Sequence, residues 1–261
     1  MNIEKLIKII KECGDIILKY RNSDKLEIEI KKDGSKVTNV DKQLNEILQN
    51  YLKDTYPTYG IMSEEIDKNV KDYTWYIDPL NGTGAYLKGF DSFNILVGLV
   101  RENIPILGLI YHPLYNKLYI GGESEIPRVR ENEKETELKM PPHIKQNLLF
   151  TPNENWEKVF TQLFEGNPDY KLVNRDMLGS EFKDSRIHIV EGSLNLEINS
   201  NFGAWGTWDV CSGHAILSQL GGVMRDYYGN DIDYSKESLD NGFISADSIE
   251  RVNQLDWIKG I

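Results

Sequence analysis

Four acidic residues stand where a strand should end or a helix should begin: Asp41, Glu64, Asp78 and Asp209. Each has an ordinary structural explanation, because carboxylates favour the first turn of a helix and are common in loops. Acids at the carboxyl ends of sheet strands, however, converge in one crevice, and several carboxylates repel one another unless a cation neutralises them. With a backbone carbonyl and water they form the all-oxygen shell that magnesium prefers. We therefore expect a magnesium site, and metal-assisted hydrolysis of a phosphate ester is its natural chemistry.

The stretch 75–83 should carry the centre of this site. The β-rich run 73–77 delivers Asp78 to the end of a strand, and Pro79 is expected to stop the strand because proline has no N–H to donate. Gly82 permits a tight turn and Thr83 can open a helix. A carboxylate and a helix N-terminus would then face the same point, as metal and phosphate binding require.

Composition bounds the function. The 261 residues are 40% hydrophobic and carry a formal net charge of -11, which argues against a nucleic-acid-binding protein but leaves small phosphorylated ligands open, since a metal supplies local positive charge. Only two cysteines are present, so we expect no disulfide framework, a reducing compartment and a cytoplasmic location. The first residues lack the apolar core of a signal peptide. No apolar run approaches the ~18 residues of a membrane span.

Hydrophobic periodicity predicts alternating helices and strands. The expected helices cover 3–20, 40–56, 82–87, 153–164, a short stretch after 179–180, 208–220 and 249–258. The expected strands cover 26–30, 59–62, 73–77, 93–100, 106–111, 117–120, 148–151, 171–174, 223–226 and 243–245, with 187–190 and 194–198 pairing as a hairpin. Thr38 and Asp41 are spaced as a capping box for the second helix. The charged run 128–139 is expected to be a solvated excursion and a seam between two lobes.

Three segments resemble the signatures of the inositol monophosphatase superfamily, a group of magnesium-dependent, lithium-sensitive phosphatases. They are Gly-Ile-Met-Ser-Glu-Glu (60–65), Trp-Tyr-Ile-Asp-Pro-Leu-Asn-Gly-Thr (75–83) and Trp-Asp-Val-Cys-Ser-Gly-His-Ala-Ile-Leu (208–217). Segment 35–41 resembles the Ser-Pro-Val-Thr-x-Ala-Asp motif of the 3′(2′),5′-bisphosphate nucleotidase (CysQ-type) branch, and 190–215 is similar to its C-terminal signature. The resemblance covers about residues 35–245.

The resemblance implies a layered α/β/α/β/α sandwich of the inositol monophosphatase and fructose-1,6-bisphosphatase type, a mixed α/β fold. Its two lobes would be 1–140, with most metal ligands, and 141–261, with Asp209 and the substrate pocket; the site would lie between them.

It also implies roles for individual residues. Two or three Mg²⁺ ions would be held by Glu64, Asp78, the Leu80 carbonyl, Asn81 and Asp209. Asp41 and Thr83 would form the dyad that activates water, with Glu64 as a further catalytic residue. The substrate would contact Gly82, Thr83, Ser180, Glu191, Asn201 and Asp209.

Departures from the family pattern keep three functions open. Asn81 stands where the family has Asp, and Gly84-Ala85-Tyr86 replaces the Lys-Glu-Phe of the nucleotidase branch. The first function is hydrolysis of adenosine 3′,5′-bisphosphate to AMP and phosphate. The second is an inositol-1-monophosphatase or histidinol-phosphatase-like activity. The third is a catalytically impaired protein that binds a phosphorylated ligand. We expect a small phosphorylated substrate and a monomer or homodimer. His214 and Cys211 are expected to be buried packing residues. Trp205 and Trp208 are expected to belong to the core, with base stacking as the alternative for Trp205, which lies in a loop.

Overall fold

A computed structural model describes residues 2–21, 23–31, 34–65, 68–132, 134–142, 147–151, 171–173, 184–199, 205–253 and 255. The helices expected at 153–164 and after 179–180 lie outside these ranges, as do Ser180 and Asn201.

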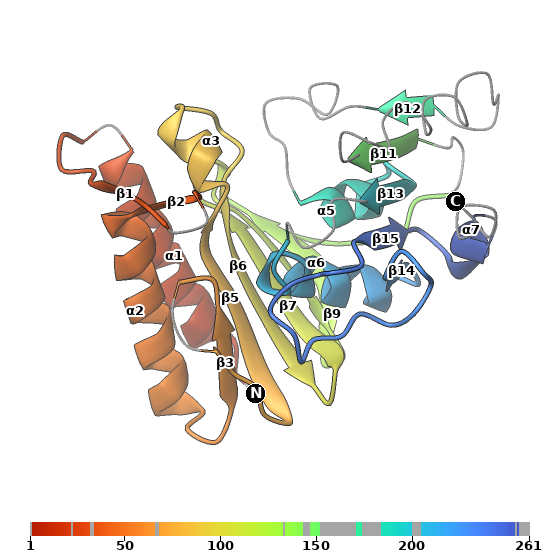
Figure 1. Ribbon diagram of the computed structural model, residues 1–261, viewed down its shortest axis with the longest axis horizontal. Coiled ribbons are helices and arrows are strands. Elements are labelled where there is room, and N and C mark those ends of the chain that lie inside the picture. Colours follow the sequence, from red (N-terminus) through yellow and green to blue (C-terminus); the bar gives the residue numbers. More distant parts are fainter. Residues whose placement is uncertain are drawn as a thin grey trace.

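The larger sheet has eight strands in the order β10-β9-β8-β7-β6-β5-β3-β4. The strands are β3 (Gly60–Ser63), β4 (Lys68–Asn69), β5 (Tyr73–Asn81), β6 (Asn94–Arg101), β7 (Ile104–His112), β8 (Lys117–Gly122), β9 (Glu125–Glu131) and β10 (Lys134–Glu137). Helices α1 (Glu4–Tyr20) and α2 (Asn39–Thr55) cover one face of this sheet (Figure 1). The meander β6-β7-β8 is antiparallel, as predicted.

Helix α6 (Trp208–Gln219) covers the other face of the large sheet, where it contacts β5 to β8. All residues from Val210 to Leu217 are buried, because the helix is enclosed between two sheets. The close approach of α6 to the sheet depends on glycines in β6 and β7. A Cβ added at Gly108 would lie 2.0 Å from the Ser212 carbonyl oxygen, and one at Gly98 would lie 2.4 Å from Cys211 Sγ. Cys211 and His214 are buried in this helix, as predicted.

Beyond α6 lies the second sheet, with order β12-β11-β13-β15-β14. Its strands are β11 (Asn147–Thr151), β12 (Lys171–Val173), β13 (Leu196–Asn199), β14 (Val223–Arg225) and β15 (Phe243–Ala246). Helix α5 (Ser185–Val190) contacts α6, β13 and β15, and α7 (Ile249–Asn253) contacts β15 (Figure 1). The layers therefore run helices, sheet, helices, sheet, helix, which confirms the predicted α/β/α/β/α architecture. No helix in the described part of the chain is long and apolar enough to cross a membrane.

Two short elements complete the region around β5. The hairpin of β1 (Ile28–Ile30) and β2 (Lys36–Thr38) leads into α2, and the single-turn helix α3 (Thr83–Leu87) follows β5. A 3-10 turn, Pro113–Tyr115, joins β7 to β8.

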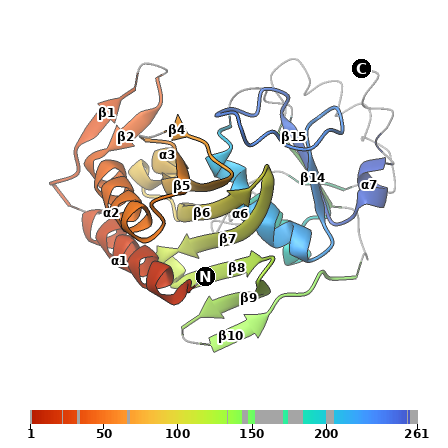
Figure 2. The same ribbon diagram turned by 90° about the horizontal axis from the view of Figure 1, so that it is seen from below.

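The run 128–139 is solvated, as predicted, with every residue of β10 exposed, but it is not an excursion from the sheet. This segment supplies most of β9 and β10, which pair antiparallel and extend the large sheet at its edge (Figure 2). The charges alternate so that Arg130 stands opposite Glu135, and Arg130 Nε donates to Glu135 Oε1 at 2.7 Å. Cross-strand pairs of opposite charge stabilise a sheet, and charged residues suit an edge strand.

The hairpin predicted at 187–198 is also wrong. Residues 185–190 form α5, because Asp184 caps it: Asp184 Oδ1 accepts a hydrogen bond from the Arg186 N–H at 2.9 Å. Only 196–199 form a strand, β13, which pairs with β11 and β15.

Pro79 does not end its strand. β5 continues to Asn81 through a bulge between Asp78 and Asn81, which removes Pro79 from the ladder with β6.

Candidate active site

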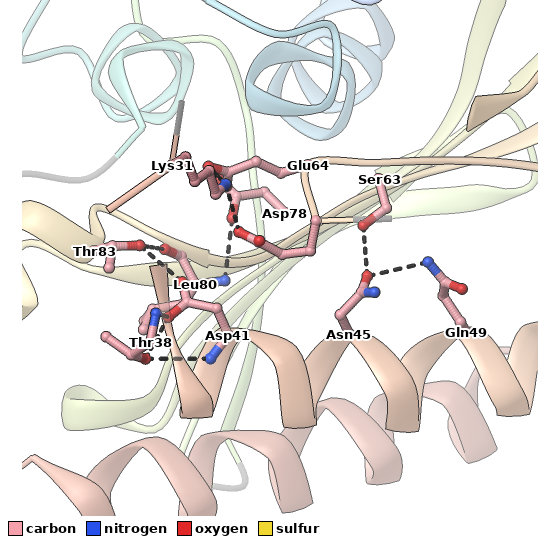
Figure 3. Close-up of polar contacts among 11 residues, drawn as sticks. Lys31, Thr38, Asp41, Asn45, Gln49, Ser63, Glu64, Asp78, Leu80 and Thr83 are labelled. Carbon is pink, nitrogen blue, oxygen red and sulfur yellow. Dashed lines mark hydrogen bonds and ion pairs between the residues drawn. The ribbon is translucent and has the colours of Figure 1, made fainter. Parts of the chain in front are cut away.

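The N-terminus of α2 and the start of α3 meet at Asp41. Thr38 caps α2 in a capping box, and Asp41 Oδ2 accepts from the Thr38 N–H at 2.8 Å. The other oxygen, Asp41 Oδ1, accepts from the Thr83 hydroxyl at 2.9 Å, and Thr83 Oγ1 also lies 2.9 Å from the Leu80 carbonyl oxygen (Figure 3). Because Asp41 is fully buried, this pair is fixed in one arrangement.

Asp78 lies on β5 just before the bulge. Its side chain is buried, and Asp78 Oδ1 accepts from the Leu80 N–H at 3.1 Å. The bulge turns the chain so that Asp78, the Leu80 carbonyl and Thr83 face the same region within six residues (Figure 3). Gly82 makes the following turn with φ +86°, and a Cβ there would lie 2.6 Å from the Ser92 carbonyl oxygen.

Glu64 follows the parallel neighbour of β5, strand β3. The Glu64 N–H donates to the Ile77 carbonyl at 3.2 Å, so the parallel pairing of β3 with β5 extends as far as Glu64. Ser63 Oγ donates to Asn45 Oδ1 at 2.6 Å and so ties the end of β3 to α2 (Figure 3). Glu64 and Asp78 therefore reach the same sheet edge because their strands are parallel and adjacent.

Lys31 enters the site from the hairpin. Lys31 Nζ donates to Glu64 Oε1 at 3.1 Å and to Glu65 Oε1 at 2.9 Å. Burial lowers the pKa of Lys31, but the charges of the two glutamates outweigh burial and raise it overall. Burial and the charge of Glu64 raise the pKa of Glu65 to about 7, against the opposing effect of Lys31.

Asp209 is brought to the site by the first turn of α6. Asp209 Oδ2 accepts from the Gly206 N–H at 2.7 Å, and the Asp209 carbonyl oxygen accepts from Arg186 Nη2 at 2.9 Å. Burial and the charge of Glu64 raise the pKa of Asp209 to about 7. Burial followed by the charges of Glu64 and Asp209 raises the pKa of Asp78 well above its ordinary value. The carboxylates of Glu64, Asp78 and Asp209 come from three separate elements, and they lie near enough to repel one another.

The chemistry of this cluster fits a hard cation. Within the described residues, no group of three or more His, Cys, Asp or Glu side chains is drawn together tightly enough to hold a metal ion as it stands. The ammonium group of Lys31 instead takes the place of a cation beside Glu64. Mg²⁺ would satisfy this set, because neighbouring negative charge raises the pKa of the buried Asp78 and Asp209 carboxyls and Glu64 already binds an ammonium group.

Asn81 ends β5 beside the cluster. Its Nδ2 donates to Asn94 Oδ1 at 3.1 Å, so the amide N–H₂ is engaged and the oxygen is the atom left for a metal. Asn81 and Asn94 line a pocket of about 300 Å³. Its remaining lining residues are Gly82, Gly84, Ala85, Ser92, Asp184, Ser185, Arg186 and Trp205. A pocket thus opens directly beside the acidic cluster.

The structure brings together most of the predicted site. Asp41, Thr83, Leu80, Glu64 and Asp78 meet at one end of β5 (Figure 3), and the charge of Asp209 acts on Asp78 from α6. Glu191 is engaged elsewhere: it is paired with Lys117 Nζ at 3.3 Å and does not line the pocket beside Asn81.

Sequence reasoning missed Lys31, Asn94 and Arg186. Lys31 lies in a charged turn with no distinguishing pattern, and Asn94 opens an otherwise apolar strand. Arg186 directly precedes the run 187–190, and sequence alone does not mark it as buried because an arginine beside an apolar run can extend into solvent.

Comparison with known proteins agrees with this architecture. A 3′(2′),5′-bisphosphate nucleotidase CysQ from Buchnera aphidicola is 27% identical, over 94% of this chain and 93% of the relative. Inositol monophosphatase 1 from Solanum lycopersicum is also 27% identical, over 88% of this chain and 85% of the relative. A solved IMPase/NADP phosphatase complexed with Mg²⁺ and phosphate superposes with a TM-score of 0.75 at 24% identity, over 97% of this chain and 94% of that one. The model of the inositol monophosphatase family matches residues 2–254. The chain therefore belongs to the inositol monophosphatase family and is a phosphoric monoester hydrolase.

Proposed function

We propose that this protein is a magnesium-dependent 3′(2′),5′-bisphosphate nucleotidase that releases phosphate from adenosine 3′,5′-bisphosphate. The observation that carries the proposal is the hydrogen bond from Thr83 to the buried Asp41, made next to the Asp78 cluster. A carboxylate and a hydroxyl so arranged can take a proton from water and orient it. The similarity to a bisphosphate nucleotidase over nearly the whole chain supports the choice of substrate.

The residues around β5 would hold the metal. Glu64, Asp78 and the Leu80 carbonyl oxygen would bind one Mg²⁺, and Asp78, Asn81 Oδ1 and Asp209 a second, with a third ion possible in the same acidic region. Bound Mg²⁺ supplies Lewis-acid activation of water and neutralises charge on the leaving oxygen. Asp41 accepts the proton, since Thr83 holds its Oδ1 towards the site. The backbone at Gly82 and Thr83 would bind the phosphate.

The pocket gives reasons for two substrates. Trp205 forms one wall, and an aromatic face can stack on a nucleobase. Asp184, Ser185 and Asn94 line the same pocket and can accept hydrogen bonds from hydroxyl groups. That second feature favours a hydroxyl-rich monophosphate, such as inositol 1-phosphate, as the alternative substrate. A further candidate, a non-catalytic binding protein, rests on the neutral Asn81.

One assay separates these functions. Phosphate release would be measured from adenosine 3′,5′-bisphosphate, inositol 1-phosphate and histidinol phosphate, with and without Mg²⁺ and Li⁺, and ranked by kcat/KM. The proposal expects Mg²⁺-dependent, Li⁺-inhibited release, fastest with the bisphosphate. Asn81→Asp should raise magnesium affinity and rate, because it restores a charge to the second metal site. Tight ligand binding without turnover in either protein would favour the binding function, and a preference for inositol 1-phosphate would replace the nucleotidase assignment.

Two broader expectations join the proposal. We propose that residues 1–140 and 141–261 are the two lobes, with α6 of the second lobe delivering Asp209 to the first. We also propose a cytoplasmic setting, supported by two cysteines that are both buried and free.

A further inference from the structure

A buried arginine connects the second sheet to the candidate metal site. Arg186 is 2% exposed and lies between two buried carboxylates. Arg186 Nη2 donates to Asp184 Oδ2, and Nη1 lies 3.7 Å from Glu197 Oε2. Glu197 is also held by Ser185, whose hydroxyl donates to Glu197 Oε2 at 2.6 Å. One guanidinium group is therefore fixed by acids from the cap of α5 and from β13.

The same guanidinium reaches the backbone of a proposed metal ligand. Arg186 Nη2 donates to the Asp209 carbonyl oxygen at 2.9 Å, in the first turn of α6. Within the described residues, Arg186 Nε and Nη1 have no hydrogen-bond partner, although both are buried. The ion pairs with Asp184 and Glu197 fix the guanidinium group, and its hydrogen bond to the Asp209 carbonyl therefore links that fixed group to the first turn of α6.

Helix α6 has a small residue where it meets this arginine. A Cβ added at Gly213 would lie 2.7 Å from Asp184 Oδ1 and 2.9 Å from Arg186 Nε. Gly213 lies one helical turn after Asp209. The helix is thus seated directly on the Asp184–Arg186 pair, and the first turn of α6 has its position set by that contact.

We propose that Arg186, held by Asp184 and Glu197, is a positioning residue that fixes the first turn of α6 so that the Asp209 carboxylate faces the metal site. The proposal rests on the proposed function, because it takes Asp209 as a magnesium ligand. Groups that orient metal ligands without touching the metal typically contribute 10–100-fold to metal affinity or activity.

The test is magnesium binding to the substrate-free protein, followed by calorimetry, alongside thermal unfolding. Arg186→Lys keeps the charge but loses the guanidinium fork, and is expected to weaken magnesium binding about 10–100-fold. Asp209→Asn should weaken it at least as much. The matched control is Arg251→Lys on α7, where a buried guanidinium donates to Asp247 at 2.6 and 3.0 Å. R251K should lower the unfolding temperature as R186K does, with magnesium affinity unchanged.

A variant on the helix side keeps the test decisive if R186K does not fold. Gly213→Ala leaves Arg186 intact but displaces α6 from it, and should weaken magnesium binding in the same way. If D209N weakens binding while R186K and G213A bind as the wild type does, Arg186 is only structural and the inference is overturned. If D209N also binds as the wild type does, Asp209 is not a ligand, and that part of the proposed function falls with it.

Discussion

Replacing Lys31 with methionine should tighten magnesium binding. Lys31 Nζ lies 3.1 Å from Glu64 Oε1 and 2.9 Å from Glu65 Oε1. Its ammonium group is therefore paired with the Glu64 carboxylate that a divalent ion would need as a ligand. Lys31→Met removes one positive charge and keeps most of the aliphatic stem. A metal would then bind Glu64 without first displacing an ammonium group.

The size of the effect follows from the exposure of the pair. Two unit charges 4 Å apart interact by about 4 kcal/mol in surroundings of effective dielectric constant 20. The Lys31 side chain is 23% exposed and that of Glu64 25%, and partly exposed ion pairs retain only about 1 kcal/mol net. Removing that competition should improve the dissociation constant roughly fivefold, since 1.36 kcal/mol corresponds to a factor of ten.

The assay is a calorimetric magnesium titration at low ionic strength, because salt screens such charges. Lys36→Met is the matched control: Lys36 begins β2 of the same hairpin and is exposed, so its loss changes the formal charge equally without touching Glu64. The reasoning is refuted if K31M binds magnesium no better than K36M, or more weakly than the wild type.

Three further variants test the site and its surroundings. Asp78→Asn should abolish turnover and magnesium binding yet stabilise the metal-free protein by ~1–2 kcal/mol, because it removes a buried carboxylate whose pKa burial has raised; denaturant unfolding without metal measures this. Thr83→Val should lower kcat about 10²–10⁴-fold through loss of its hydrogen bond to Asp41, while Thr83→Ser retains most activity; equal loss in both would remove the hydroxyl from the mechanism. Burial, with two nearby arginines, lowers the pKa of His214 from 6.5 to about 3, so the unfolded chain takes up this proton first and the contribution of His214 to stability falls as pH drops below about 6.5, against the opposite contribution of carboxyls with raised pKa such as Asp209 and Glu65. His214→Gln should flatten this pH dependence, and urea unfolding at pH 7.5 and 5 gives the comparison.

Local patterns predicted most of the fold because burial and capping are written into adjacent residues. The amphipathic face of α1 and the capping box at Thr38 are local signals, and both elements formed as expected. Two other local patterns gave wrong predictions. The charges of 128–139 concealed a hairpin in which Arg130 stands opposite Glu135, and the largely apolar run 187–190 looked like a strand although the adjacent Asp184 caps a helix there.

The acidic residues of the candidate site could be predicted because strand ends and helix starts are local features of the sequence. Their polar contacts could not, because those depend on tertiary structure. Acids at strand ends and helix starts are read from the sequence, and in the structure the charges of Glu64 and Asp209 act on Asp78. The groups that surround them depend on tertiary contacts alone. Lys31 reaches Glu64 across 33 positions of sequence, and Arg186 reaches the Asp209 carbonyl across 23.

These cations offset part of the repulsion among the carboxylates around β5. Lys31 compensates Glu64 and Glu65 on the hairpin side, and Arg186 lies behind Asp209 on the side of the second sheet. Burial and the charges of Glu64 and Asp209 raise the pKa of Asp78. The uncompensated charge is therefore concentrated on β5. A cation is favoured there, because the buried Asp78 carboxylate carries the repulsion of Glu64 and Asp209 and forms no ion pair with a positive side chain among the described residues.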